Sequence, residues 1–418
     1  MPKKNYWEER SRMSNIPKLR FPEFKGEWEE KKLNSIFTKI TQRNSDNQNS
    51  NVITNSATEG LVSQRDYFDK DIANKDKTDN YFIIKNGDFV YNPRKSSAAP
   101  YGPFTQYKLL DDGIVSPLYL CLRKNNSEVE SKYLENYFKT TCWHQYIYEN
   151  GSSGARHDRV SIHDDVLLAM PIKVPSFPEQ QKIADFLSNV DSIITAETKI
   201  LKTLQKKKKA LMQKLFTQQL RFKSANGTDF SAWEEKKLGE ISSSPKYGLN
   251  ASGIDYDGEH KYLRITDIDE VTHTFSPEEI TTPSEFSDDY LLEENDIVFA
   301  RTGASTGKTY LYNPNDGDLY FAGFLIKFHI KDANARFVFY QTCTHEYEKW
   351  VHVMSTRSGQ PGINSEEYST LKIKLPCIEE QQKIADCLSS LDSLIQTQQK
   401  VVTTWQQRKK ALLQQMFV

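Results

Sequence analysis

The strongest constraint on this sequence is a long stretch without glycine or proline that occurs twice. The first copy runs from Glu179 to Phe216, and Pro178 stands directly before it, where the first turn of a helix accepts proline. Hydrophobic residues recur along it at alternating steps of three and four, which predicts one helix, roughly 55 Å long, with a single apolar stripe. A helix of that length with such a stripe needs a partner that covers the stripe.

The second copy supplies this partner. The sequence EQQKIAD begins at Glu179 and again at Glu380, an offset of 380 − 179 = 201. The apolar positions recur at the same offset, and so do two polar interruptions of the stripe. The interruption at Glu197 becomes Gln398, and Lys208 becomes Lys409. Two ordinary amphipathic core helices would not be expected to share these interruptions, so the sequence predicts a coiled coil formed by the two copies.

The charges in the stripe favour an antiparallel pair. A parallel pair in register would place Lys208 against Lys409, two like charges in an apolar layer. An antiparallel pair whose position numbers sum to 606 instead places Glu197 near Lys409 and Lys208 near Gln398. Because a buried charge without a partner is strongly unfavourable, we expect the antiparallel register. The same register predicts two apolar layers, Leu201 with Trp405 and Leu204 with Val402.

The rest of the chain is also duplicated. WEEKKL occurs at Trp28 and Trp233, and LRF occurs at Leu19 and Leu220. We therefore expect an α+β protein with two tandem mixed α/β domains, separated by two long helices and related by a pseudo-twofold axis. Outside the shared framework the two domains differ strongly, which suggests two different targets. The expected boundaries are 1–19 for an N-terminal tail, 20–175 and 225–375 for the two domains, and 176–224 and 376–418 for the helical regions.

Composition narrows the possible functions. The 55 lysines and arginines are balanced by 56 aspartates and glutamates, so a nucleic-acid ligand would require basic and acidic residues on separate surfaces. The five cysteines contain no CxxC pair, and the histidines show neither metal-ligand nor catalytic-triad spacing. We expect no metal, no disulfide framework and no catalytic residue. No signal peptide or membrane-spanning stretch stands out, so a soluble, cytoplasmic protein is expected.

Two glycine-containing loops, 151–159 and 355–364, occupy matching places before the last β-type run of each domain. Both combine small residues with side chains that make forked hydrogen bonds to base edges, arginine to guanine and glutamine or asparagine to adenine. These loops are candidate DNA contacts, although a solvated turn is the alternative for each. The loop candidates are Arg156, His157, Arg159, Arg357, Gln360 and Asn364. Further candidates that follow β-type runs are Arg94, Lys95, Arg264, Arg301 and Thr302.

The segment Gly303–Thr309 resembles a phosphate-binding loop but has three residues between its glycines, where such loops have four. A strand-like run, Tyr310–Tyr312, follows it instead of the helix that would cap a nucleotide phosphate. We therefore favour a hairpin whose amides and Lys308 approach a DNA phosphate. A plain surface turn, a nucleotide-dependent enzyme and a coiled-coil scaffold without DNA function are the alternatives.

The paired EQQKIAD helix starts, the YLRITDID run from Tyr262 and the ARTGASTGKT run from Ala300 resemble the specificity subunit of type I restriction–modification systems. The resemblance covers the chain from about Leu19 to Val418. It implies two target-recognition domains that each read one half of a bipartite site on double-stranded DNA, and helices that set the spacer. It also implies two adenine-N6 methyltransferase subunits as partners, restriction/translocase subunits bound through them, and no membrane. S-adenosylmethionine, ATP and Mg would belong to these partners, so no cofactor is expected on this chain.

Overall fold

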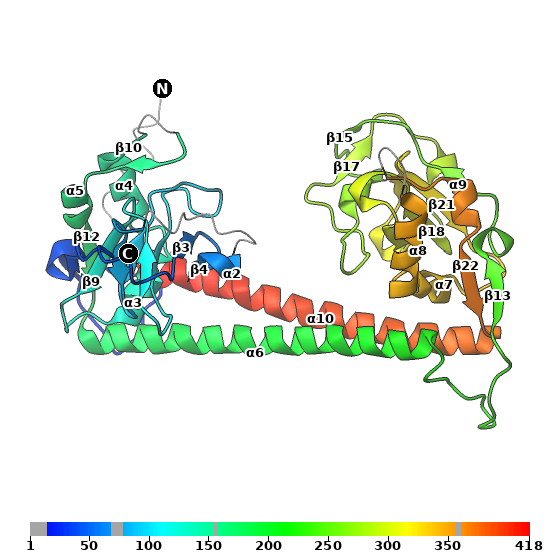
Figure 1. Ribbon diagram of the computed structural model, residues 1–418, viewed down its shortest axis with the longest axis horizontal. Helices are drawn as coiled ribbons and strands as arrows, with labels where there is room; N and C mark the ends of the chain where they lie inside the picture. The colour runs from blue at the N-terminus through cyan, green and yellow to red at the C-terminus, as the bar shows by residue number, and fades with distance from the viewer. Residues whose placement is uncertain (1–14, 68–77, 154–156, 357–360) are drawn as a thin grey trace. The chain divides into compact units, whose positions relative to one another are not determined.

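A computed structural model of the chain describes residues 15–67, 78–153, 157–356 and 361–418 (Figure 1). The chain forms two compact units, each of which takes part of both long helices. The first unit extends to Thr198 and includes Lys400–Val418, and the second unit comprises Lys199–Gln399. The expected mixed α/β composition of two tandem domains with two long helices is confirmed.

In the first unit the first and last strands along the chain pair with each other: β1 (Glu29–Lys32) is antiparallel to β12 (Pro171–Val174). Its largest sheet has the antiparallel order β2-β9-β6-β7, formed by Phe37–Lys39, Leu120–Lys124, Phe89–Tyr91 and Phe104–Gln106. Three two-stranded pairs accompany this sheet: β3 (Ile53–Ser56) with β4 (Gly60–Ser63), β5 (Phe82–Ile84) with β8 (Gly113–Val115), and β10 (Ser152–Ser153) with β11 (Val160–Ser161). The helices are α2 (Gln64–Tyr67), α3 (Ser131–Phe138), α4 (His144–Asn150), α5 (Asp164–Leu168) and the 3-10 turn η2 (Leu33–Ser35).

The second unit repeats this plan. The strands β13 (Glu234–Lys237) and β22 (Lys372–Leu375) close it, and its main antiparallel sheet has the order β14-β21-β18-β19. That sheet comprises Lys246–Tyr247, Leu325–His329, Asp296–Ala300 and Thr309–Leu311. Two further pairs are β15 (Gly253–Asp255) with β17 (Thr281–Pro283) and, in parallel, β16 (Lys261–Leu263) with β20 (Leu319–Phe321). The helices are α7 (Ala335–Gln341), α8 (His345–Ser355) and α9 (Ser365–Ser369), and the 3-10 turns are η4 (Leu238–Glu240), η5 (Ile265–Asp267), η6 (Asp288–Tyr290), η7 (Gly303–Ser305) and η8 (Pro314–Asp316).

The long stretches are single helices, α6 (Phe177–Phe216) and α10 (Ile378–Met416). In the first unit, Ile183 and Leu187 at the start of α6 share a buried core with Leu413 and Met416 at the end of α10. In the second unit the roles are exchanged, since Met212 and Leu215 of α6 pack with Ile384 and Leu388 of α10. Early residues of one helix therefore meet late residues of the other within each unit, and the expected antiparallel direction is confirmed.

The predicted partners of the two buried-stripe lysines are wrong. The Lys208 ammonium lies 2.5 Å from Asp392, and Lys409 forms an ion pair with Asp191. These position numbers sum to 600 in both pairs (208 + 392 and 409 + 191), whereas the predicted register sums to 606. The sequence prediction pairs these lysines with Glu197 and Gln398 because it matches only residues inside the stripe.

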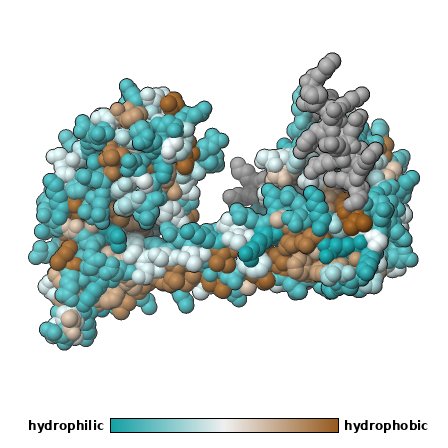
Figure 2. Space-filling view, turned by 180° about the vertical axis from the view of Figure 1, so that it is seen from behind, coloured by the Kyte–Doolittle hydropathy of each residue, from teal (hydrophilic) through white to brown (hydrophobic). Residues whose placement is uncertain are grey.

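A lysine side chain is long enough to carry its ammonium out of an apolar layer to a flanking carboxylate. Asp191 and Asp392 occupy such flanking positions, one residue after Val190 and Leu391 of the stripe. The predicted layers of Leu201 with Trp405 and Leu204 with Val402 each join residues of different units and stay predictions. On the face shown in Figure 2 brown patches follow the long helices, whose exposed hydrophobic side chains include Ile193, Ile200 and Leu394.

Within the described ranges, no helix is both long enough and apolar enough to span a lipid bilayer.

Candidate nucleic-acid interface

The repeated EQQKIAD motif attaches each globular domain to a long helix. The Glu179 carboxylate is buried and accepts two hydrogen bonds from the Arg20 guanidinium, at 2.7 and 2.8 Å. Glu380 does the same with Arg221, at 3.1 and 2.7 Å. Both arginines belong to the repeated LRF motif, so in each unit the LRF motif is bonded to the EQQKIAD motif.

The first glutamine of the motif makes the second attachment. Gln180 donates to the carbonyl of the proline five residues before it, at 2.8 Å, and accepts from the amide of Glu130 at the start of α3, also at 2.8 Å. Gln381 repeats both contacts at 2.8 and 2.9 Å, with Asn334 at the start of α7 in place of Glu130. We call these contacts the helix-start joint; it comprises Arg20, Glu179 and Gln180 in the first unit and Arg221, Glu380 and Gln381 in the second.

The candidate DNA-binding residues of the first unit come together after strand β6. Arg94 forms an isolated antiparallel bridge with Arg159, and the Lys95 amide donates to the Asp158 carbonyl at 2.8 Å. The Arg94 side chain is 68% exposed and lies 3.7 Å from the Asp158 carboxylate. His157 is exposed in the same loop. Two segments more than sixty residues apart thus form one surface with three basic side chains, Arg94, Lys95 and Arg159.

The second unit has the corresponding arrangement after strand β18. Thr302 bridges to Gly362, and the Ile363 amide donates to the Arg301 carbonyl at 2.9 Å. The Gly303 amide donates to the Pro361 carbonyl at 3.0 Å, which fixes the two loops side by side. The same pairing of a post-strand arginine with a distant loop therefore occurs in both units. Arg156, Arg357 and Gln360 lie outside the described residues.

Comparison with known proteins identifies this duplicated architecture. The sequence matches the family model for the type I restriction modification DNA specificity domain twice, over residues 25–206 and 231–404. The chain belongs to this family. As a member it is a non-catalytic specificity subunit with a role in DNA recognition.

Individual relatives agree with this assignment. The chain is 27% identical over 321 residues to the type I restriction enzyme MjaVIII specificity subunit of Methanocaldococcus jannaschii, covering 72% of each chain. It is 26% identical over 197 residues to the HindI specificity subunit of Haemophilus influenzae, covering 45% of this chain and 41% of that one.

Solved structures share the fold. A type I restriction–modification S subunit from M. genitalium superposes with a TM-score of 0.54 at 16% identity, covering 96% of this chain and 99% of that one. A chain from a structure of complex assembly in a type I R-M system gives a TM-score of 0.55 at 15% identity, covering 92% of this chain and 96% of that one.

Three predicted DNA contacts of this specificity subunit have side chains that are engaged within their own domain. The Lys308 side chain is only 11% exposed, and its ammonium donates to the Ile268 carbonyl at 3.0 Å, so it is not presented to a phosphate. The Arg264 guanidinium donates two hydrogen bonds to the buried Asp267 carboxylate, at 2.9 and 2.8 Å. These bonds raise the pKa of Arg264. The Asn364 side chain caps helix α9 by accepting from the Glu367 amide at 2.8 Å.

The segment that resembled a phosphate-binding loop is a 3-10 turn followed by strand β19, as expected. A phosphate-binding loop requires a helix at this place, because helix amides cradle the phosphate. The nucleotide-dependent alternative therefore loses its structural basis.

Two aromatic residues that the sequence did not single out lie beside Arg301. Its guanidinium is 5.0 Å from the centroid of the Tyr247 ring, a cation–π contact that restricts its orientation. The Tyr247 hydroxyl accepts from the Ser365 amide at 3.2 Å. Phe324 is 60% exposed, and its carbonyl accepts from the Arg301 amide at 3.0 Å. Because residues 247, 301, 324 and 365 come from different strands and loops, no local pattern in the sequence could group them.

Within the part of the chain that the structure describes, one cluster has metal-ligating side chains, formed by Glu293, Asp296 and His329. Asp296 is fully buried and already accepts from the Lys327 ammonium at 3.0 Å, the Glu293 amide at 2.9 Å and the His329 ring at 2.9 Å. Both of its oxygens are thus hydrogen-bonded and its charge is compensated by lysine. We interpret the cluster as a structural ion-pair network that stabilises the start of β18.

Proposed function

We propose that each globular domain of this specificity subunit reads one half of a bipartite site on double-stranded DNA. The observation that carries the proposal is the recurrence of one arrangement with different side chains. In each unit an arginine that follows a central strand is fixed against a distant loop, through Arg94 and Arg159 or through Arg301 and Thr302 with Gly362. Equivalent frames with dissimilar loops suit two readers of two different sequences.

Arg301 is the base-contact residue best supported by its surroundings. Its cation–π contact with Tyr247 limits the rotamers of the guanidinium, so less conformational freedom is lost when it binds a base edge. Arg94 is more exposed and lies 3.7 Å from Asp158, and we assign this exposed charge to a phosphate contact. Lys95, Arg159, His157 and Thr302 complete the two surfaces, and Arg156, Arg357 and Gln360 remain candidates from the sequence.

The long helices carry the protein partners in this proposal, and they set the spacer between the half-sites. The complex would contain two adenine-N6 methyltransferase subunits, with restriction/translocase subunits attached through them. An apolar groove of about 410 Å³ between α6 and α10 of the first unit supports a helical partner. Its walls include Phe186 and Ile193 of α6 and Trp405 and Leu412 of α10. S-adenosylmethionine, ATP and Mg would bind to the partners, and the complex would act in the cytoplasm.

Methylome mapping tests the proposed function directly. Cells that carry this chain with its methyltransferase should show modified adenines in one bipartite motif with a fixed spacer. Arg301→Ala should then weaken the reading of one half-site only, by ~1–3 kcal/mol for a lost bidentate base contact. Lys349→Ala, an exposed lysine of α8 in the same unit, serves as the matched charge control. Absence of any bipartite motif, or an equal loss on all sequences, would contradict the proposal and favour a scaffold or a purely electrostatic role.

A further inference from the structure

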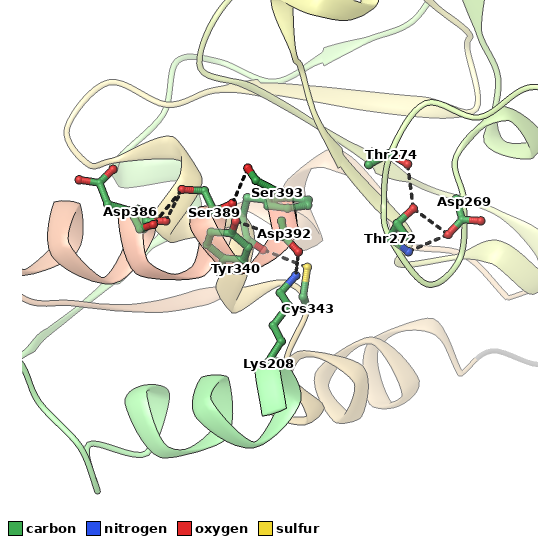
Figure 3. Close-up of polar contacts among 12 residues, drawn as sticks. Lys208, Asp269, Thr272, Thr274, Tyr340, Cys343, Asp386, Ser389, Asp392 and Ser393 are labelled. Carbon is green, nitrogen blue, oxygen red and sulfur yellow. Dashed lines mark hydrogen bonds and ion pairs between the residues drawn. The ribbon is translucent and has the colours of Figure 1, made fainter. Parts of the chain in front are cut away.

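The two globular domains differ in how firmly they are attached to the long helices. In the second unit three elements meet at the Asp392 carboxylate of α10 (Figure 3). The Lys208 ammonium of α6 lies 2.5 Å from one oxygen, and the Tyr340 hydroxyl of α7 donates to the other at 2.7 Å. The same ammonium lies 5.2 Å from the centroid of the Tyr340 ring. One residue of the globular domain thus contacts both long helices.

This contact is the second of two fixed points between α7 and α10. At the start of α7, Asn334 is bound by Gln381 at 2.9 Å and by Gln382 at 2.7 Å. At its end, Tyr340 is bound by Asp392. The two points on α10 are 392 − 381 = 11 residues apart, or roughly 16 Å along a helix. One point alone would act as a pivot, whereas two separated points fix the direction of the domain on its helix.

The Tyr340 hydroxyl is well suited to this role. The residue is 4% exposed and burial, together with Asp392, raises the pKa of the hydroxyl, so it remains a proton donor. Beside it, Gln341 joins α7 to strand β22, because its amide donates to the Lys374 carbonyl at 3.0 Å and its oxygen accepts from the Lys374 amide at 3.1 Å. Strand β22 leads directly into α10, so the residue after Tyr340 joins α7 to the segment that begins this helix.

Among the described residues of the first unit, no contact equivalent to that of Tyr340 occurs. Gln180 and Gln381 correspond by the offset of 201, and they bind Glu130 and Asn334, so these two residues correspond. Six residues after Asn334 is Tyr340, and six residues after Glu130 is Asn136. Asn136 is 4% exposed, and its side-chain oxygen has no hydrogen-bond partner among the described residues.

A second difference lies at the same joint. The buried indole nitrogen of Trp28 also lacks a partner in the described part of the chain, whereas its counterpart Trp233 donates to Glu380 at 3.3 Å.

We propose that Tyr340 is a positioning residue that locks the second recognition domain onto the helix pair and thereby fixes the spacer length that this side of the subunit accepts. The inference rests on the proposed function, because spacer length has meaning only for a bipartite site. It assigns the control of spacer length to a contact between the globular domain and the helix pair, and to one unit rather than both.

The test uses the full chain assembled with its methyltransferase subunits. Methylation rates are measured on duplexes with both half-sites constant and the spacer at its preferred length or one base pair shorter or longer. Tyr340→Phe keeps the ring and removes the hydroxyl. It should lower the ratio of kcat/KM between the preferred and altered spacers by about 10-fold or more, the effect expected for one hydrogen bond to a charged group. The rate on the preferred spacer and the half-sites read should stay unchanged.

The matched control is Asn136→Ala in the first unit, which should leave the spacer ratio within about twofold of the wild type, because the bond it loses, from the Asn136 amide to the Lys132 carbonyl, lies within α3 and does not reach the long helices. If Tyr340→Phe does not assemble, Asp392→Ala, which removes the acceptor of the Tyr340 bond together with the ion pair to Lys208, should give the same change, whereas Lys208→Met, which removes only the ion pair, should leave the ratio unchanged. An unchanged ratio in Tyr340→Phe, or an equal change in Asn136→Ala, would overturn the proposal.

Hydrogen–deuterium exchange on the full chain tests the lock without DNA. Tyr340→Phe should speed exchange in α7 and leave α3 unaffected, and unchanged exchange in α7 would refute the lock. A wild-type complex that methylates no bipartite site would instead refute the proposed function, and the exchange result would still decide whether the lock exists.

Discussion

The helix-start joint makes a strong prediction about stability in the second unit. Glu380 has no exposed surface, and its carboxylate is held by Arg221 at 3.1 and 2.7 Å and by the Trp233 indole at 3.3 Å. Arg221→Met keeps a side chain of similar length but leaves the carboxylate buried with only the indole donor. Removing one partner of a buried ion pair costs about 3–5 kcal/mol, because the other charge is left uncompensated. For a unit of about 200 residues this corresponds to a fall in Tm of roughly 6–20 °C.

The control is an ion pair of the same length in the same unit. Lys372 and Glu235 lie 2.7 Å apart, but their side chains are 68% and 47% exposed. Lys372→Met should therefore cost about 0–1 kcal/mol, since water already screens an exposed pair. The comparison separates burial from distance, because the shortest N–O distance is 2.7 Å in both pairs.

The assay is urea unfolding followed by far-UV circular dichroism and tryptophan fluorescence. Arg221→Met combined with Glu380→Met should recover most of the loss, because a buried ion pair can be replaced by apolar residues at little net cost. A loss of stability in Arg221→Met no larger than that in Lys372→Met, or a double variant no more stable than the single one, would show that burial of the Glu380 charge does not set the cost.

Three further predictions concern other parts of the chain. A double-mutant cycle between Lys409 and Asp191 should give a coupling of about 0.5–1 kcal/mol, whereas the cycle between Lys409 and Glu197 should give close to none; the reverse result would restore the 606 register. Burial lowers the pKa of His273, whose ring nitrogen lies 3.0 Å from the Thr309 carbonyl, so the folded state favours the neutral ring. The contribution of His273 to the free energy of unfolding should be fully present above roughly pH 6.5, where its imidazole is neutral in the unfolded chain as well, and should be lost as the pH drops toward the lowered pKa of the folded state. His273→Gln should therefore reduce the dependence of the free energy of unfolding on pH between pH 7.5 and 5.5, measured by urea titration. Trp405→Ala should weaken binding of the methyltransferase to the groove of the first unit in sedimentation experiments, while Tyr148→Ala, exposed elsewhere in that unit, should not.

The sequence predicted the long helices and the duplicated framework well, because both are encoded in periodic patterns that survive without tertiary context. It could not predict the partners of Lys208 and Lys409, since long side chains leave the layer in which their Cα atoms lie. Lys308 looked like a phosphate ligand, yet the loop that contains Ile268 covers it. Conversely, Tyr247 and Phe324 become candidate binding residues only because the folded chain places them beside Arg301, and the sequence does not show this proximity.

The constant offset between the helix copies explains why one ion pair implies the other. If residue i of α6 meets residue j of α10 in an antiparallel pair, then j − 201 in α6 and i + 201 in α10 have the same sum and meet as well. Lys208 with Asp392 therefore generates Asp191 with Lys409, and both pairs occur. A parallel pair in register would instead match each residue with its own copy, lysine with lysine and aspartate with aspartate. Duplication by a fixed offset thus turns a single favourable contact into two in the antiparallel arrangement and into two repulsions in the parallel one, which is why the direction of the helices follows from the repeat even where the register does not.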